Sequence, residues 1–509
     1  MKRVITGTVA LAVAFASLAF TASPTPEGKL TFASTSPPTV SLNPAVGPPS
    51  SKVAVSGRHF GAYEAVDVYF DTTDEKLATA NGTGSFTTTI HIPASATPGT
   101  HWFTAIGRHS GLAAQTVFTV QTNWAQYRDD PAHTGFNGFE NVLGPSNVSG
   151  LTLAWTATTG GAITSSPAVV NGVAYVGSND GKLYAFPTSC NGTCSPLWTG
   201  ITGGSIGRSS PAVANGVVYI GSEDGKLYAF STACRGTCPP LWTGSIGTST
   251  DSSPTVANGV VYIGSTTKLY AFPASCSGTC SPLWTGVTGG YTWDPTVANK
   301  LVYVGLDYFA ATCKGSCAPL GHGNQGTNWT TSPAAANGLV YYGFDSGNNG
   351  VAVKAFPKTC SGACAPVWVN WIGVESYVQG APAVANGVVY FGSTDGTLYV
   401  LSASLVELWE GYTAGSIYSS PAVANGVVYV GSDDDNVYAF PASCSTPCSP
   451  LWTGLTGGPV DSSPAVANGV VYVGSGDGKL YAYSLGMVAG PARPFPYGLH
   501  PNYSLKVSA

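Results

Sequence analysis

The sequence predicts an all-β protein in which a small β-sandwich precedes a closed β-propeller of eight blades. A phrase related to Ser-Ser-Pro-Ala-Val occurs eight times at intervals of 38 to 49 residues, and Asn-Gly follows it in seven copies. This period is typical of propeller blades, which each contain four strands. The composition agrees, because 65 glycines and only 9% charged residues among 509 favour short strands and tight turns over helices.

The chain begins with features typical of an exported protein. Lys2 and Arg3 precede an apolar stretch that ends near Phe20, and small residues follow it. This pattern predicts a signal peptide over residues 1–22, and a membrane anchor is the alternative. Residues 23–35 are rich in Pro, Ser and Thr and predict a linker. We expect a secreted or extracellular protein, or a periplasmic one if the producer has an outer membrane, with no membrane insertion after signal cleavage.

Residues 36–121 predict a separate β domain. Short alternating runs, such as Val66–Phe70 and Val117–Val120, are separated by turn residues. About seven short strands in this length fit a β-sandwich of immunoglobulin type. The stretch from Leu42 to Phe60 also resembles the opening of the immunoglobulin-like domains of bacterial surface proteins. That resemblance implies a spacer.

Each of the eight repeats carries the turn chemistry of tight hairpins. Asn-Gly separates the first two strands in seven copies, as at Asn171-Gly172, and copy four has Asn299-Lys300 instead. Both central residues of a type I′ turn need positive φ, which Asn and Gly adopt at low cost. The sequence therefore predicts that the first two strands of every blade form a hairpin.

The order of the strands predicts how the propeller closes. A strand of the type that ends each repeat occurs before the first repeat, at Leu151 to Trp155, and the last repeat stops at Tyr483 without one. The early strand should therefore complete the last blade and remove two open sheet edges. The predicted propeller covers residues 122–485, and residues 486–509 form an irregular tail.

The repeat, read in full, resembles a known family. The phrase Ser-Pro-Ala-Val-x-Asn-Gly-Val-Val-Tyr, continued by Asp-Gly-Lys-Leu-Tyr-Ala-Phe, is similar to the pyrroloquinoline quinone (PQQ) repeat, and the segment from Trp124 to Asn137 resembles the usual lead-in to such propellers. The resemblance implies the propeller fold. The family includes PQQ-dependent dehydrogenases and propellers without a cofactor, such as the outer-membrane assembly scaffold lipoprotein, so the fold leaves the function open.

All twelve cysteines fall in pairs with three residues between the partners. Each pair lies between the third strand of a repeat and the Trp strand. We predict six local disulfides across the tips of hairpins, since secretion favours oxidation. Zinc binding is the alternative, but pairs on different blades cannot converge on one ion. The pairs are Cys190/Cys194, Cys234/Cys238, Cys276/Cys280, Cys313/Cys317, Cys360/Cys364 and Cys444/Cys448.

The catalytic signals of the quinone enzymes are missing from the sequence. Those enzymes carry the phrase Ala-x-Asp-x-x-Thr-Gly-Lys-x-x-Trp, whereas this chain has Pro187 in place of the Asp and a cysteine loop in place of Thr-Gly-Lys. The sequence contains neither two adjacent cysteines nor a haem attachment motif. These departures favour a non-catalytic propeller and leave the question of an enzyme open.

The residues just before each Ser-Pro should surround the propeller axis, because the innermost strand of a blade begins there. We predict a ligand-binding mouth at this end, and a water-filled, non-specific channel is the alternative. The predicted mouth comprises Arg208, Asp251, Trp293, Asp294, Gln379, Tyr418 and Asp461.

These observations predict a secreted, monomeric propeller that acts as a binding or protein-interaction platform. The net charge of −5 excludes nucleic acid bound through phosphate neutralisation. A protein or glycan is the expected partner, and no cofactor or metal is predicted. One alternative is a PQQ- and calcium-dependent dehydrogenase of alcohols or sugars. The other is a protein that binds carbohydrate or the cell wall.

Overall fold

The computed structural model describes residues 36–290, 292–323, 330–345, 351–360, 362–373 and 377–486. The predicted signal peptide and linker lie outside the described residues, and so does the predicted tail beyond Gly486. No helix among the described residues is long and apolar enough to cross a membrane. Apart from η1 (Val148–Gly150), a single turn of 3₁₀ helix, the regular structure of these residues consists of strands, as predicted.

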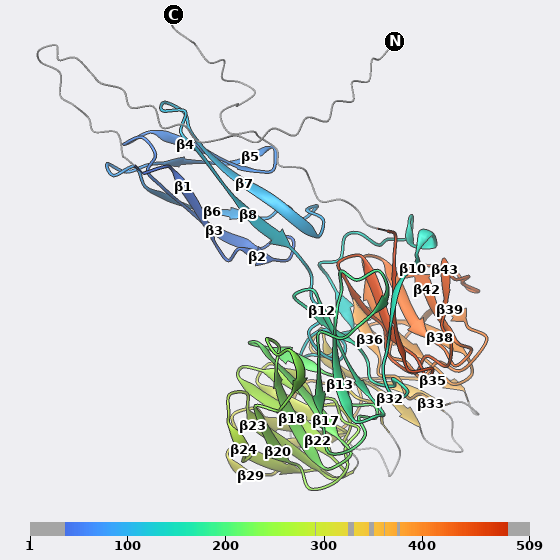
Figure 1. The fold of residues 1–509 in the computed structure, drawn as a ribbon. Coiled ribbons are helices and arrows are strands. Elements are labelled where there is room, and N and C mark those ends of the chain that lie inside the picture. Colours follow the sequence, from blue (N-terminus) through green and yellow to red (C-terminus); the bar gives the residue numbers. More distant parts are fainter. Residues whose placement is uncertain are drawn as a thin grey trace, which may run out of the picture.

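Residues 36–121 form two sheets that enclose a core of their own. The core contains Val55, Phe70 and Phe103, and Figure 1 shows this domain in blue beside the propeller. The immunoglobulin relationship stays a prediction. The three-stranded sheet consists of β1 (Thr39–Asn43), β3 (Lys52–Arg58) and β6 (Phe86–His91). The five-stranded sheet consists of β2 (Val46–Gly47), β8 (Ala113–Val120), β7 (Gly99–Gly107), β4 (Ala65–Phe70) and β5 (Thr73–Thr79).

Eight further sheets are the blades of the propeller, as predicted. From the axis outward, the first strands are β11 (Ala168–Val170), β16 (Ala212–Ala214), β21 (Thr255–Ala257), β26 (Thr296–Ala298), β31 (Ala334–Ala336), β36 (Ala383–Ala385), β40 (Ala422–Ala424) and β44 (Ala465–Ala467). The second strands are β12 (Val173–Ser178), β17 (Val217–Ser222), β22 (Val260–Ser265), β27 (Leu301–Val304), β32 (Leu339–Asp345), β37 (Val388–Gly392), β41 (Val427–Gly431) and β45 (Val470–Gly474).

The outer half of each blade follows the same order. The third strands are β13 (Lys182–Pro187), β18 (Lys226–Ser231), β23 (Lys268–Pro273), β28 (Asp307–Ala310), β33 (Val351–Pro357), β38 (Thr397–Ser402), β42 (Asn436–Pro441) and β46 (Lys479–Ser484). The fourth strands are β15 (Trp198–Ile201), β20 (Trp242–Ser245), β25 (Trp284–Val287), β30 (Gly321–Gly323), β35 (Trp368–Gly373), β39 (Glu407–Tyr412), β43 (Trp452–Leu455) and β10 (Thr152–Thr158).

The hairpin turns and the closure of the ring follow the sequence. Asn171 and Gly172 have φ of 52° and 76°, as a type I′ turn requires, and Asn299 and Lys300 adopt the same geometry at 52° and 66°. Strand β10 pairs antiparallel with β46, the last strand of the final repeat. The predicted closure of the last blade by the strand before the first repeat is therefore confirmed.

The six predicted disulfides are present, with Cα–Cα distances of 5.9 to 6.5 Å. As predicted, each pair lies in the connection between the third and fourth strands of a blade, which pair as an antiparallel hairpin. Five cysteine segments form a fifth strand that pairs in parallel with the fourth strand of the preceding blade. In these pairs a glycine faces the position of the tryptophan, as Gly236 faces Trp198. The five strands are β14 (Gly192–Cys194), β19 (Gly236–Cys238), β24 (Gly278–Cys280), β29 (Gly315–Cys317) and β34 (Gly362–Cys364).

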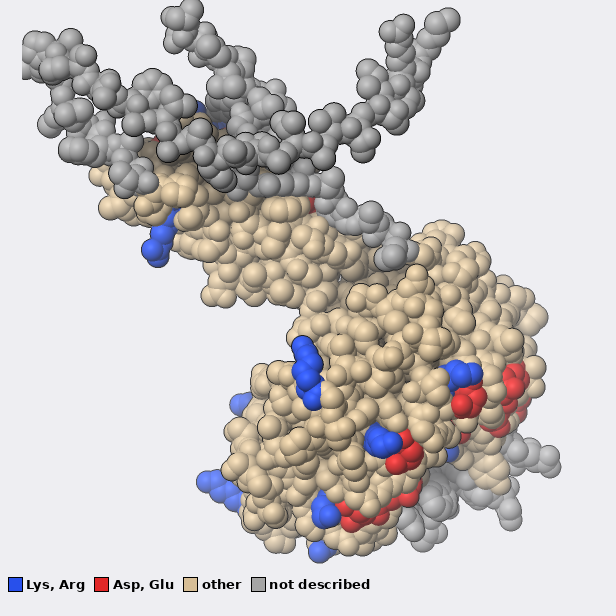
Figure 2. All heavy atoms as spheres, in the orientation of Figure 1, with Lys and Arg blue, Asp and Glu red and all other residues tan. Residues whose placement is uncertain are grey.

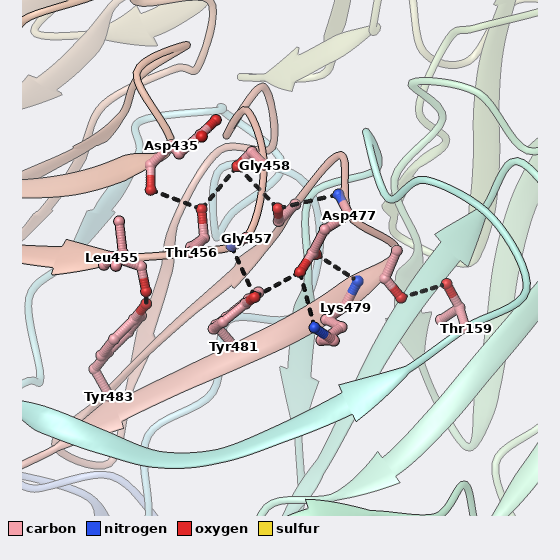
Figure 3. Close-up of polar contacts among 12 residues, drawn as sticks. Thr159, Asp435, Leu455, Thr456, Gly457, Gly458, Asp477, Lys479, Tyr481 and Tyr483 are labelled. Atoms are coloured by element: carbon pink, nitrogen blue, oxygen red, sulfur yellow. Dashed lines mark hydrogen bonds and ion pairs between the residues drawn. The ribbon is translucent and has the colours of Figure 1, made fainter.

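Polar groups in the Asp-Gly turns join neighbouring blades. The Tyr481 hydroxyl donates to Asp477 Oδ2 at 2.6 Å and accepts from the N–H of Gly457 in the preceding blade at 2.8 Å (Figure 3). The Lys479 ammonium lies 3.2 Å from the same carboxylate. Burial alone would raise the pKa of Asp477, but the hydrogen bonds from Tyr481, Lys479 and Ser475 outweigh it and lower that pKa. Figure 2 shows acidic and basic atoms side by side on part of the propeller face, together with isolated basic residues elsewhere on it.

Candidate functional site

A lead-in segment closes the propeller axis below its mouth. Between Trp124 and Asn137 the chain winds around the axis and contacts the innermost strands of all eight blades in order. This path uses Gly135 at a φ of 65°, where a Cβ would lie 2.9 Å from Pro421 O. The partners of the segment in blades one to eight are Val169, Val213, Val256, Val297, Ala335, Val384, Val423 and Val466.

The centre of this lead-in segment is buried and polar. The two ring nitrogens of His133 lie 2.9 Å from Thr255 Oγ1 and 3.0 Å from Thr296 Oγ1. Burial lowers the pKa of His133 well below its usual range, and the neighbouring guanidinium of Arg128 adds to the effect. Arg128 is itself buried, and its pKa falls to about 10 because burial disfavours its charge. The sequence resemblance marked this segment as a lead-in but did not reveal that it fills the axis.

A ring of hydrogen bonds surrounds the axis just above the lead-in segment. In seven of the eight blades, the residue before Pro donates its N–H to the side chain of the equivalent residue in the next blade, as Ser166 donates to Ser210 Oγ at 2.9 Å. The last blade closes the ring, since the Ser463 N–H donates to Ser166 Oγ at 2.9 Å. The first Ser of the Ser-Ser-Pro phrase acts within its own blade, where Ser165 Oγ accepts from the Gly177 N–H at 3.1 Å. The recurring phrase thus fixes the packing of the blades at the axis.

Blades four and six depart from this ring. Asp294 replaces a serine, and its buried carboxylate accepts from the Ser253 N–H and from the Ser332 hydroxyl. Burial raises the pKa of Asp294, and the hydrogen bonds from Ser332 and Ser253 oppose that shift. Blade six has Gly380 and Ala381 instead of two serines. The structure therefore places Asp294 within the ring rather than at an open surface, unlike the sequence-based expectation.

A cavity of about 360 Å³ lies at the mouth, between these two departing blades. Arg208 of blade two reaches across the axis, and its Nη1 donates to Gln379 Oε1 of blade six at 2.9 Å. In a ring of eight, blades two and six stand opposite each other, so this contact spans the mouth. The described lining residues are Arg208, Trp293, Thr330, Thr331, Tyr377, Val378 and Gln379.

The structure brings three of the predicted mouth residues, Arg208, Trp293 and Gln379, into one cavity and places the others around it. Asp251 Oδ1 accepts from the Arg208 backbone N–H at 3.4 Å. Asp461 faces the charge of Arg208, and burial raises its pKa while that charge opposes the rise. Tyr418 is half-buried and does not line the cavity. The ligand-binding role of these residues stays a prediction.

Of the other four cavity residues, Thr330 stands at the Ser-Pro register position of blade five, and the sequence reasoning missed Thr331, Tyr377 and Val378. Each lies one or two residues from a position that the Ser-Pro register placed at the mouth. Including the neighbours of those positions would have found all three residues. Tyr377 is 55% exposed, which leaves its ring available at the rim. Together with Trp293 it gives the cavity an aromatic wall beside a guanidinium.

The lining of the cavity does not fit a calcium ion. Calcium takes six to eight oxygen ligands, several of them carboxylates, whereas the charged side chain among the described lining residues is the guanidinium of Arg208. Among the residues that the structure describes, no group of three or more His, Cys, Asp or Glu side chains could hold a metal ion. The described lining residues of the mouth therefore do not fit a calcium-bound quinone.

Comparisons with known proteins agree with the fold. The family model described as outer membrane protein assembly factor BamB matches residues 147–331 and 329–485. No curated protein matches the chain significantly.

Three solved structures share the propeller fold with this chain. Quinohemoprotein alcohol dehydrogenase ADHIIG from Pseudomonas putida HK5 is 14% identical over 74% of this chain and 82% of its own, with a TM-score of 0.54. The computationally designed Ika8 protein is 14% identical over 65% and 99%, also at 0.54. Sqt1 from Saccharomyces cerevisiae is 11% identical over 65% and 95%, at 0.51. At these identities the likeness shows the fold alone.

Proposed function

Since the chain belongs to the family described as outer membrane protein assembly factor BamB, we propose that its propeller is a binding platform for another protein. The recognition site is the cavity at the mouth of the axis. Its ligand is a carboxylate side chain on an exposed segment of the partner. The six disulfides indicate an oxidising compartment, so the partner is met outside the cytoplasm.

The observation that carries this proposal is the position of Arg208. Its guanidinium has five N–H donors in a planar fork, and the contact with Gln379 Oε1 holds that fork across the mouth. The remaining donors match the two oxygens of a carboxylate, and such bidentate pairs are among the strongest hydrogen bonds in proteins. Arg208 is exposed and is the charged side chain among the described lining residues. Asp461 faces its charge from beside the cavity but forms no ion pair with it, so a ligand reaches Arg208 without displacing an ion pair in the lining.

The aromatic wall favours a second candidate, a glycan. Trp293 and Tyr377 line the same cavity, and aromatic rings offer apolar faces with polar edges that suit a sugar ring as well as a side-chain stem. The two candidates differ in what they demand of Arg208. A carboxylate depends on the guanidinium, whereas a neutral sugar depends on the rings.

A peptide library displayed on phage tests the proposal. We expect the native protein to enrich peptides with Asp or Glu, and Arg208→Met to abolish that enrichment by removing the bidentate donors. Arg235→Met is the matched control, because Arg235 is also exposed but lies on a cysteine loop away from the mouth. It should leave the enrichment unchanged.

Three outcomes would overturn the proposal. One is an absence of acidic enrichment, and another is an enrichment that survives Arg208→Met. The third is binding of neutral glycans that Trp293→Ala abolishes and Arg208→Met does not affect, which would establish the glycan candidate. Dye reduction over alcohols and sugars after addition of PQQ and calcium would establish the dehydrogenase alternative.

A further inference from the structure

The outer edges of the blades differ in how they are covered. In five blades, the cysteine strand of the next blade pairs with the fourth strand and hides its edge. Trp198, Trp242 and Trp284 are consequently only 1 to 2% exposed. The glycine in register with each of these tryptophans has a φ of 67° to 71°, a left-handed backbone conformation that favours glycine.

Two further edges are covered in other ways. In blade six, the Cys448 N–H donates to Glu410 O at 2.9 Å, which attaches the last cysteine loop to β39. In blade seven, η1 lies against β43, and the Trp452 indole N–H donates to Leu151 O at 2.9 Å. Seven of the eight fourth strands therefore have a neighbour on their outer side.

Strand β35 of blade five has no strand paired with its outer edge among the described residues, although the Asn370 side-chain amide donates to Leu405 O of the next blade at 2.9 Å. Its sheet ends with β35 in the order β31-β32-β33-β35. The next repeat has no cysteine pair, and its connection turns back on itself where the Ser402 N–H donates to Val406 O at 2.8 Å. Trp368, equivalent to the buried tryptophans, is 45% exposed, and Trp371 is 54% exposed.

We propose that β35 is a docking edge at which an extended segment of a partner protein adds the missing fifth strand. The five internal examples define the occupant. It runs parallel to β35, places a glycine opposite Trp368, and continues with small uncharged residues, as in Gly-Thr-Cys. Strand addition of this kind combines backbone hydrogen bonds with a side-chain pocket. An exposed apolar edge is otherwise a site of aggregation, which proteins normally protect.

The chain itself supplies the probe, because residues 274–283 contain a complete cysteine loop, Ala-Ser-Cys-Ser-Gly-Thr-Cys-Ser-Pro-Leu. The oxidised, fluorescently labelled peptide is titrated with the intact protein, and hydrogen exchange locates the contact. We expect saturable binding with slower exchange over 367–373. Val369→Asp should weaken binding at least about tenfold, which corresponds to 1.4 kcal/mol. Leu241→Asp should change it less than about twofold, because the edge beside Leu241 is already paired with β24.

A second arm leaves the protein unchanged. A peptide with valine in place of Gly278 should not bind, because the strand holds Gly278 at a φ of 67°, which is strained for a β-branched residue. Absence of saturable binding by the native peptide, protection at another blade, or equal effects of the two protein variants would overturn the proposal. So would self-association of the free protein that Val369→Asp abolishes, because the occupant would then be a second copy. Arg208→Met should not affect this edge, so its test is independent of the mouth.

Discussion

Replacing Trp242 and Trp368 by alanine in separate variants measures what the cysteine strand contributes to each blade. Trp242 is 2% exposed and lies under β24, with its ring 6.1 Å from Phe272. Trp368 occupies the equivalent place in blade five but is 45% exposed. The two substitutions remove the same side chain from covered and uncovered positions.

The expected costs follow from the buried area. A buried tryptophan removes roughly 150–250 Å² from water, which at about 25 cal/mol per Å² stabilises the fold by about 4–6 kcal/mol. Trp242→Ala should therefore cost about 4–5 kcal/mol, near the top of the usual range for such core truncations. Trp368 buries only about half of its surface, so Trp368→Ala should cost about 2–3 kcal/mol.

The assay is urea unfolding without reductant, followed by far-UV circular dichroism, so that the loss of one indole does not change the signal. The midpoint and slope give the difference in unfolding free energy between each variant and the native protein. Trp242→Phe and Trp368→Phe serve as controls that keep an aromatic ring. Equal losses at the two positions, or a larger loss at Trp368, would refute the idea that the cysteine strand buries the tryptophan of the preceding blade.

Two further predictions concern the turns and the disulfides. The folded-state pKa of Asp477 lies below the ordinary value of an aspartate, so its carboxylate contributes stability above that ordinary pKa and loses it as the pH falls through the folded pKa. Asp477→Asn should therefore lower the unfolding midpoint at pH 6 but have little effect near pH 2, and a difference independent of pH would contradict this reasoning. Replacing both Cys234 and Cys238 by serine should lower the unfolding free energy by roughly 2 kcal/mol through chain entropy. It should also shift the fluorescence of Trp198 to the red, because β19 covers that ring. Unchanged emission would contradict the idea that β19 covers Trp198.

The features of the fold that recur in every repeat could be predicted from the sequence. Eight copies of one phrase determine the number of blades, and the early strand at Trp155 determines the closure, because both follow from counting. The disulfide partners could be predicted because three-residue spacing allows only local pairing in separate blades. None of these inferences required knowledge of which segments of different sequence contact each other in the fold.

The missed features all depend on contacts between segments that do not resemble each other. Nothing in the spacing of Cys234 and Cys238 indicates that Gly236 faces Trp198 of another blade. The path of the lead-in segment could not be predicted from the sequence either. The one sign of it is that Thr255 and Thr296, which contact His133, replace the alanine that follows Pro in the other repeats. At the mouth, the Ser-Pro register placed Arg208 and Gln379 correctly at the axis but could not show that they meet across it.

Departures from the repeat gather in blades four to six, and at several of them neighbouring groups compensate. Where blade four has Gly321 in place of tryptophan, the ring of Tyr308 fills the space, and a Cβ on Gly321 would lie 2.6 Å from it. Asp294 keeps the axial ring intact by accepting from Ser253 and Ser332.

In blade six, Gly380 fits where a Cβ would lie 2.3 Å from Ser419 O. Random decay of a repeat would leave unfilled space and unpaired groups at such positions, because each blade packs against its neighbours alone. Compensated change in one sector, which holds both the cavity and the open edge of β35, is what the proposed binding role of this side of the propeller requires.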